Sequence, residues 1–152
     1  MKSLIQTLFH ALLFSSVPLW ASAEAFVLGD LTINDTIATE TPVTANAGAG
    51  YLTITNAGTT DAKLIKIDAA FARVMIHDMV IENEIAKMTH MDSLTIPAGE
   101  SVTFAPGGMH VMFMGLNGDP FEVGEEIPAT LVFEKAGQID VVFTVKARDH
   151  QH

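Results

Sequence analysis

Short runs of alternating apolar and polar residues recur along the chain, and they predict β-strands. Residues 51–56 alternate cleanly and place Leu52 and Ile54 on one face. Pro, Gly and Asn separate such runs at intervals of about eight to twelve residues. No stretch sustains a helical period. The pattern therefore indicates an all-β domain, arranged as a sandwich or a barrel.

The predicted strands follow from these runs and from their flanking turns. They cover residues 26–33, 51–56, 62–67, 72–81, 84–91, 101–105, 109–116, 127–134 and 138–145. We expect residues 34–50 to form a loop with at most a short extended piece, because Thr, Ala, Gly and Pro are frequent there. Residues 51–56 and 62–67 are expected to pair as a hairpin, and so are the last two strands.

The first 23 residues have the pattern of an export signal. Lys2 supplies a positive start, residues 4–20 are mostly apolar, and Ala21-Ser22-Ala23 is a cleavage site. The apolar run is short and interrupted for a membrane span. We expect cleavage after Ala23, which leaves residues 24–152 as a single domain. An uncleaved anchor is the alternative.

Composition narrows the class of protein. The chain has no cysteine, which excludes a disulfide framework, a lipidated N-terminal cysteine and a thiolate copper site within these residues. Without a cysteine for lipidation we expect the mature protein to be soluble, and we expect it to be a monomer. The net charge is −10, and removal of Lys2 with the signal makes it more negative. Such a charge disfavours nucleic acid and anionic membranes. It is compatible with cations or a basic partner, although solubility alone explains it.

Histidine and methionine recur together between residues 75 and 115, and their spacing predicts a metal site. His110 and Met112 are two residues apart on one predicted strand, so they share a face about 6.6–6.8 Å apart. With Glu82-Asn83 as a hairpin loop, His77 lies opposite Met88, with Cβ atoms roughly 4.5–5.5 Å apart. The turn before His110 places it at a strand start, where the four side chains could converge.

The ligand types favour Cu(I), because this soft ion prefers thioether and imidazole. Zinc prefers thiolate, imidazole and carboxylate, and calcium and magnesium prefer oxygen. A single methionine is more often a core filler than a ligand, and a lone histidine on a strand is usually structural. The combination of two His and two Met at these offsets outweighs those single-residue interpretations.

The remaining residues near the four candidates receive separate expectations. In the expected register Met75 lies opposite His90, and this pair forms either a second copper contact or a solvent-facing pair. Met79 shares the face of His77 and shields the site. Met91 and Met109 point to the other face. Met114 is expected in the core.

The spacing of His77, Met88, His110 and Met112 gives the motif H-x10-M-x21-H-x-M. With the segments YLTITNAG, IHDM, LTIPAGESVTFAPGGMHVMFMGL and TLVFEKAGQIDVVFTV, it resembles the PCuAC family of periplasmic copper chaperones. The resemblance covers roughly residues 51–145. The region before residue 51 departs from the family pattern, which concerns the first strand and not the site.

The resemblance implies a cupredoxin-like Greek-key β-sandwich with the four motif residues as Cu(I) ligands. It implies copper transfer, commonly to the copper A centre of cytochrome c oxidase, in some systems with a thiol-containing assembly factor, and no catalysed reaction. Some relatives bind Cu(II) through a C-terminal tail, whereas this chain has only His150 and His152 there.

Two other classes remain open at this point. A metal-free exported β-sandwich used for interaction would have the same strand pattern. A copper redox or electron-transfer protein is the other, although the chain lacks the cysteine of a blue-copper site.

Overall fold

A computed structural model describes residues 24–148 of the chain. The segments in which apolar and polar residues alternate form β-strands there. The predicted signal sequence and the tail histidines lie outside these residues, so their expectations remain predictions. The described residues form eleven strands: β1 (Phe26–Leu28), β2 (Leu31–Thr39), β3 (Ala47–Asn56), β4 (Ala62–Asp68), β5 (Arg73–Glu82), β6 (Ile85–Met91), β7 (Leu94–Ile96), β8 (Ser101–Thr103), β9 (His110–Met114), β10 (Glu126–Phe133) and β11 (Gly137–Lys146).

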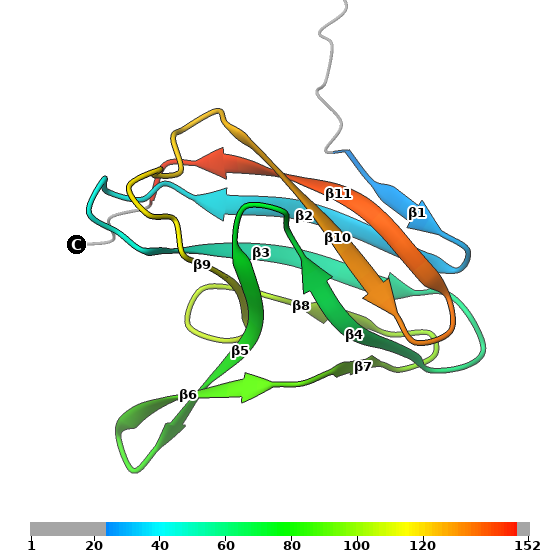
Figure 1. Cartoon of the computed structure of the whole chain (residues 1–152). Helices are drawn as coiled ribbons and strands as arrows, with labels where there is room; N and C mark the ends of the chain where they lie inside the picture. The colour runs from blue at the N-terminus through cyan, green and yellow to red at the C-terminus, as the bar shows by residue number, and fades with distance from the viewer. Residues whose placement is uncertain (1–23, 149–152) are drawn as a thin grey trace, which may run out of the picture.

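The strands pair in the order β6-β5-β9-β3-β2-β11-β10-β4-β7, while β1 pairs with β2 and β8 with β3. The pair β2–β11 is parallel, and the other strand pairs are antiparallel. This path folds over on itself, so that β10 and β4 lie in front of β2 and β3 (Figure 1). The expected all-β, cupredoxin-like Greek-key sandwich is confirmed. Residues 24–148 contain no helix long and apolar enough to cross a membrane.

The core lies between the layers and is filled by the inward residues of each alternating strand. In β3, for example, every second residue is buried. The largest fully buried side chains are Phe104, Phe113, Phe143, Ile33, Leu52, Ile54, Leu64, Ile96 and Leu131. Phe113 packs against two other aromatic rings, with its centroid 5.6 Å from those of Phe121 and Phe143. Burial of such aliphatic and aromatic surface is the main stabilising contribution in a domain without disulfides.

The expectation of a loop at residues 34–50 is wrong, because β2 continues to Thr39 and β3 begins at Ala47. Tertiary packing explains the error. A Cβ on Gly48 would lie 2.5 Å from the Phe121 ring, and one on Gly50 would lie 2.9 Å from the Phe113 ring. These glycines allow aromatic rings to lie against the strand, which overrides their low strand propensity.

Two other pairing expectations are corrected. The expected strand at residues 26–33 is divided into β1 and β2, and Gly29 at the break has a φ of 59°. The expected hairpin of β3 with β4 does not form, since β4 pairs with β10 and β7. Asn56 donates from Nδ2 to the carbonyls of Thr60 and Ile96, 2.9 and 3.1 Å away. These bonds hold the connection that leads the chain into the other layer. The last hairpin, β10–β11, forms as predicted.

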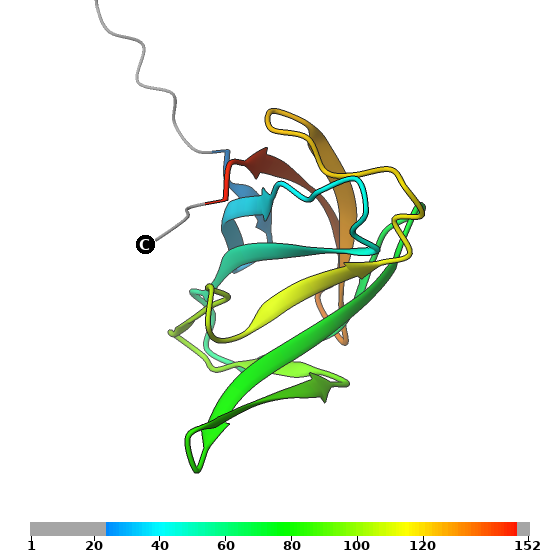
Figure 2. The same ribbon diagram turned by 90° about the vertical axis from the view of Figure 1, so that its left-hand side faces the viewer.

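The β5–β6 hairpin projects from the body of the molecule in both ribbon views (Figures 1 and 2). Its loop consists of Asn83 and Glu84, with φ values of 51° and 65°, and not of Glu82 and Asn83 as expected. Two consecutive left-handed residues are the signature of a two-residue hairpin turn whose twist matches the strands. The turn pairs Glu82 with Ile85, so every later cross-strand partner differs from the expected one by two residues.

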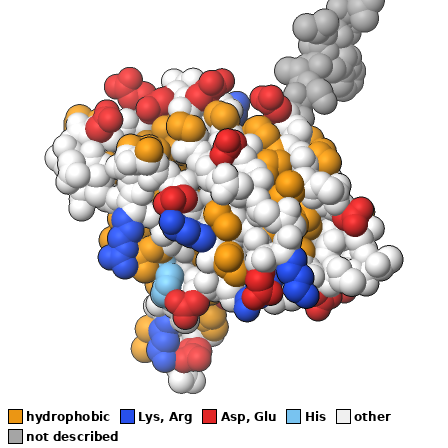
Figure 3. Space-filling model, turned by 45° about the vertical axis from the view of Figure 1, so that its right-hand side comes forward, with side chains coloured by type: hydrophobic (Ala, Val, Ile, Leu, Met, Phe, Trp, Pro, Cys, Tyr) orange, Lys and Arg blue, Asp and Glu red, His pale blue; other side chains and the backbone are white. Residues whose placement is uncertain are grey.

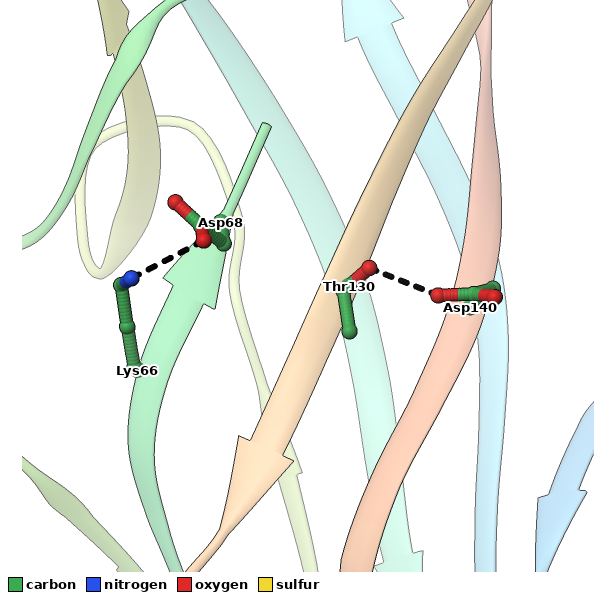
Figure 4. A network of polar contacts seen from close by, with 4 residues as sticks. All are labelled: Lys66, Asp68, Thr130 and Asp140. Carbon is green, nitrogen blue, oxygen red and sulfur yellow. Dashed lines mark hydrogen bonds and ion pairs between the residues drawn. The ribbon is translucent and has the colours of Figure 1, made fainter. Parts of the chain in front are cut away.

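The outer face of the opposite layer, formed by β4, β10 and β11, includes charged and hydroxyl side chains that contact one another. Figure 4 shows Lys66 Nζ donating to Asp68 Oδ2 at 2.9 Å and Thr130 Oγ1 donating to Asp140 Oδ1 at 2.6 Å. Exposed contacts of this kind contribute little to stability. This layer therefore presents an ordinary solvated surface, in contrast to the outer face of β5, β6 and β9.

Candidate metal centre

Histidine and methionine side chains occupy the outer face of three neighbouring strands. On β5, β6 and β9, alternate residues point away from the core, because Ile76, Val111 and Phe113 on the other face are buried. The outward set is Met75, His77 and Met79 on β5, Met88 and His90 on β6, and His110, Met112 and Met114 on β9. The sheet thus gathers soft and imidazole ligands on one surface.

Three histidines form a row across this surface. His77 is the direct cross-strand partner of both His90 on β6 and His110 on β9. Its ring centroid lies 5.7 Å from each of the other two, with interplanar angles of 90° and 81°. The rings therefore meet edge to face. His77 is the one member of the row that can share a metal with either neighbour.

His110 is fixed at the start of β9 by the turn before it, as its sequence position predicts. Pro106-Gly107-Gly108 forms this turn, with Gly107 at a φ of 82° and Gly108 donating its N–H to the Ala105 carbonyl. The Gly108 carbonyl accepts a hydrogen bond from His110 Nδ1 at 3.0 Å. A carbonyl can only accept, so the proton resides on Nδ1 and Nε2 carries a lone pair. His110 is 7% exposed, so its imidazole is held in a fixed orientation before any metal binds.

His77 carries a buried ring nitrogen, Nδ1, that has no hydrogen-bond partner within the described residues. Burial lowers the pKa of His77, and the neighbouring His110 and His90 rings lower it further when charged. An unpartnered buried polar atom is unfavourable and calls for an explanation in a folded protein. A neutral imidazole with a free nitrogen is the form that binds a metal.

Methionine pairs flank the histidine row on both sides. Met75 lies opposite Met112 across β5 and β9, and Met79 lies opposite Met88 across β5 and β6. Met88 is 50% exposed, whereas Met75, Met79 and Met112 are partly buried. Figure 3 shows histidine surface beside hydrophobic side chains where the hairpin leaves the body. A methionine pair therefore lies two residues before His77 along β5, and another lies two residues after it.

The structure brings three of the four predicted ligands together. His77, His110 and Met112 occupy adjacent positions on β5 and β9. The expectation that Met88 lies opposite His77 is wrong, because Met88 pairs with Met79 and is a diagonal neighbour of His77. In a flat sheet Met88 and Met112 would be separated by about 10 Å across the strands and about 13 Å along them. A metal bound by both requires the twisted hairpin to curl towards β9.

Some of the expectations for the surrounding residues are confirmed and others are wrong. Met75 and His90 are not partners, since they lie opposite Met112 and His77 respectively. Met91 and Met109 pack against the core as expected. Met114 does not, because it lies on the outward face of β9, opposite Arg73 and Ala47. Sequence reasoning missed the contact of His90 with His77, and the turn-forming Asn83 was the one local sign of the correct register.

The donor set constrains the metal. Within residues 24–148, no three His, Cys, Asp or Glu side chains form a group that could hold a metal ion. A metal on this face would therefore need methionine sulfur in its coordination shell. Thioether with neutral imidazole is a donor set for a soft monovalent ion and fits zinc, calcium or magnesium poorly.

Comparison with known proteins gives independent evidence on the family. The family model described as "Putative lipoprotein LpqE-like" matches residues 31–145. A curated relative, "Putative lipoprotein Lxx21020" of Leifsonia xyli subsp. xyli, is 33% identical over 100 residues, which are 64% of this chain. The aligned part of the chain spans 60% of that relative's length.

Solved structures of similar fold include two forms of one PCuAC domain. The apo PmoF2 PCuAC domain is 26% identical, with a TM-score of 0.70 over 85% of this chain and 99% of that one. The copper-bound PCuAC domain from PmoF2 is 25% identical, with a TM-score of 0.70 over 82% and 99%. CuI-DR1885 from Deinococcus radiodurans is 32% identical, with a TM-score of 0.57 over 73% and 76%.

Proposed function

Because this chain belongs to the LpqE-like family, which is the PCuAC family, we propose that it is a copper chaperone that binds Cu(I) and delivers it to a partner protein. The observation that carries the proposal is the outward cluster of imidazole and thioether groups around His77. Copper-bound forms of the similar domains support the same metal. Copper is the cargo of such a protein and not a catalytic cofactor, so no reaction is assigned to the chain.

We assign the Cu(I) ligands to His77, Met88, His110 and Met112. His77 and His110 come from directly opposed positions, and Met112 follows His110 on the same face. Met88 is the fourth ligand, supplied by the projecting hairpin when it curls towards β9. Its exposure makes it the ligand that a partner can displace first.

The ligand chemistry suits transfer. Two imidazoles and two thioethers are neutral, so Cu(I) keeps its single positive charge and is held without a strong electrostatic contribution. Thiolates bind copper more tightly, but in an oxidising compartment they are prone to disulfide formation. Release proceeds by exchange, in which a partner ligand enters as methionine or histidine leaves, and the copper remains Cu(I) throughout.

We further propose that the chain acts as a monomer in the periplasm after export. The recipient would be the copper A subunit of cytochrome c oxidase or a thiol-containing assembly factor. The test is the copper content and activity of the oxidase in a deletion strain grown under copper limitation. Both should fall, and added copper should restore them. If the copper content of the oxidase is unchanged in the deletion strain, the protein serves copper tolerance and not oxidase assembly.

The binding proposal is tested by anaerobic Cu(I) titration against a competing chelator. Loss of a group that hydrogen-bonds to a metal ligand commonly costs about 10–100-fold in metal affinity, so loss of a ligand itself should cost at least about tenfold. We expect this for Met112→Leu, His110→Ala and Met88→Leu. Met114→Leu is the matched control, because it removes a methionine from the same face away from His77.

Two outcomes would contradict the assignment. Parent-like affinity in both Met112→Leu and His110→Ala would exclude the four-ligand site. The absence of any Cu(I) binding by the parent would leave the exported domain as a metal-free interaction module.

A further inference from the structure

The ligand surface is symmetric about His77. On the β9 side, His77 faces His110, and the methionine pair Met75–Met112 lies next to them along the strands. On the β6 side, it faces His90, and the pair Met79–Met88 lies next to them. Each side therefore offers two imidazoles and two thioethers, with His77 common to both.

The spacing allows each half to surround a metal without the other. Cross-strand partners have Cβ atoms roughly 4.5–5.5 Å apart, and alternate residues along a strand are about 6.6–6.8 Å apart. The centre of such a quadrilateral lies about 4 Å from each Cβ, within reach of methionine sulfur and imidazole nitrogen. In a flat sheet, by contrast, Met88 and Met112 are too far apart to meet there.

We propose that Met79, Met88 and His90 form a second, solvent-facing Cu(I) site beside His77. The proposal rests on the proposed function in assuming the same metal. With one ion bound, Met88 completes the site of His77, His110 and Met112. With two ions bound, His77 stays with the inner ion because its neutral ring has one lone pair, Met88 belongs to the outer ion, and Met75 takes its place beside Met112. The outer position is the more exposed, since Met88 is 50% exposed and His110 is 7% exposed.

His90 is oriented for this role by its neighbour. Its Nε2 lies 3.2 Å from Asp92 Oδ1 in an exposed contact. In a neutral ring whose proton on Nε2 faces this carboxylate, Nδ1 has the lone pair. The cation of the hairpin, Lys87, pairs with Glu82, and both belong to the opposite face of the hairpin. The ligands of the outer site therefore face no lysine on their own strands.

Two positions that share His77 provide a path for the cargo. Copper that binds at the exposed hairpin reaches His110 and Met112 by exchanging ligands around His77, and Met88 can remain bound for part of that step. Copper–ligand bonds alone form and break, and the metal stays Cu(I). A partner would collect copper from the outer position without access to the buried His110.

Stoichiometry tests the second site. In an anaerobic Cu(I) titration followed by native mass spectrometry, the parent should bind two ions, the second at least about tenfold more weakly. Met79→Leu combined with His90→Gln should bind one ion, with the first affinity changed by less than about threefold. Met114→Leu, which removes an outward methionine away from both positions, should still bind two.

Methyl resonances of methionine provide a second readout that reports folding as well. The first equivalent of Ag(I), a redox-inert substitute for Cu(I), should shift the Met112 and Met88 methyls, and the second should shift Met79 and Met75. A parent that binds a single ion without any effect of the Met79/His90 double substitution would overturn the second site and leave the chaperone proposal standing. A parent that binds no ion would overturn both.

Discussion

At the scale of the residue, His77 is the centre of the site because two other imidazoles lie beside it at the same distance. Its lowered pKa follows mainly from burial and then from the neighbouring histidines. The proton is thereby lost at a lower pH than from an ordinary imidazole, for which the pKa is about 6.5. At a given pH, His77 is consequently neutral, and able to bind a metal, in a larger fraction of molecules than an ordinary imidazole.

The titration of His77 provides a direct prediction. In the apo protein, NMR should give His77 a midpoint below about 6.5, and His90→Gln should raise it without fully restoring it, because burial remains. Between the two pKa values the unfolded chain binds more protons than the folded one, so the free energy of unfolding should fall as the pH falls through this window. A His77 midpoint above the ordinary value would contradict the environment described for the ring.

Much of the site could be predicted at this scale. Motif spacing predicted His77, His110 and Met112 as candidate ligands, and the structure places them on adjacent strands. The role of His90 could not be predicted, because its contact with His77 depends on a register difference of two residues. Alternation along a strand assigns faces correctly even when partners are wrong, which is why Met91 was placed correctly.

At the scale of the element, the β5–β6 hairpin decides which ligands meet. Its strands were predicted within one residue, but its turn was displaced by one position. Asn tolerates the left-handed conformation, whereas Glu84 at a φ of 65° is unfavourable there. The absence of the usual glycine concealed the turn type in the sequence.

Glu84→Gly should therefore stabilise the hairpin, by up to about 1 kcal/mol, since glycine adopts positive φ without steric penalty. Hydrogen exchange of the β5 and β6 amides should slow, while Cu(I) affinity should stay the same. Glu84→Ala is the control, because it removes the same carboxylate and keeps the strain. Equal effects from both substitutions would show that charge, and not backbone conformation, matters at this turn.

At the scale of the whole molecule, the core and the proposed metal-binding surface use opposite faces of the same strands. Val111 and Phe113 point into the sandwich, and His110 and Met112 point outwards. The sandwich class was predictable from alternation, but the path of β2, β3 and β4 was not. Long-range contacts, such as Phe121 and Phe113 against glycines of β3, leave no local trace in the sequence.

Because the core and the ligand surface are on opposite faces, a substitution that destabilises the core should leave the Cu(I) affinity of the folded protein unchanged. Gly50→Ala places a methyl group 2.9 Å from the Phe113 ring and 3.2 Å from the Phe143 ring, which should destabilise the fold by about 1–3 kcal/mol. Urea denaturation should show this loss, and the folded fraction should bind Cu(I) like the parent. Gly108→Ala, whose methyl would meet nothing closer than 3.7 Å, should be nearly neutral for stability. A copper affinity that falls with Gly50→Ala would show that the two faces are coupled.

The two-residue turn at Asn83 and Glu84 also gives a meaning to the number of residues between His77 and Met88. Because side chains alternate, the parity of that interval determines whether the two residues point to the same side of the sheet. One residue inserted in the turn would lengthen the loop. If the strand pairs nearest the body were held in place, their partners would not change. If the pairs nearest the turn were held instead, β6 would slip, and Lys87 and Thr89 would replace Met88 and His90 on the ligand surface. The interval in the motif is thus tied to the length of the turn. As long as the two-residue turn is kept, a change of the interval that leaves Met88 and His90 on the ligand surface has to come in steps of two.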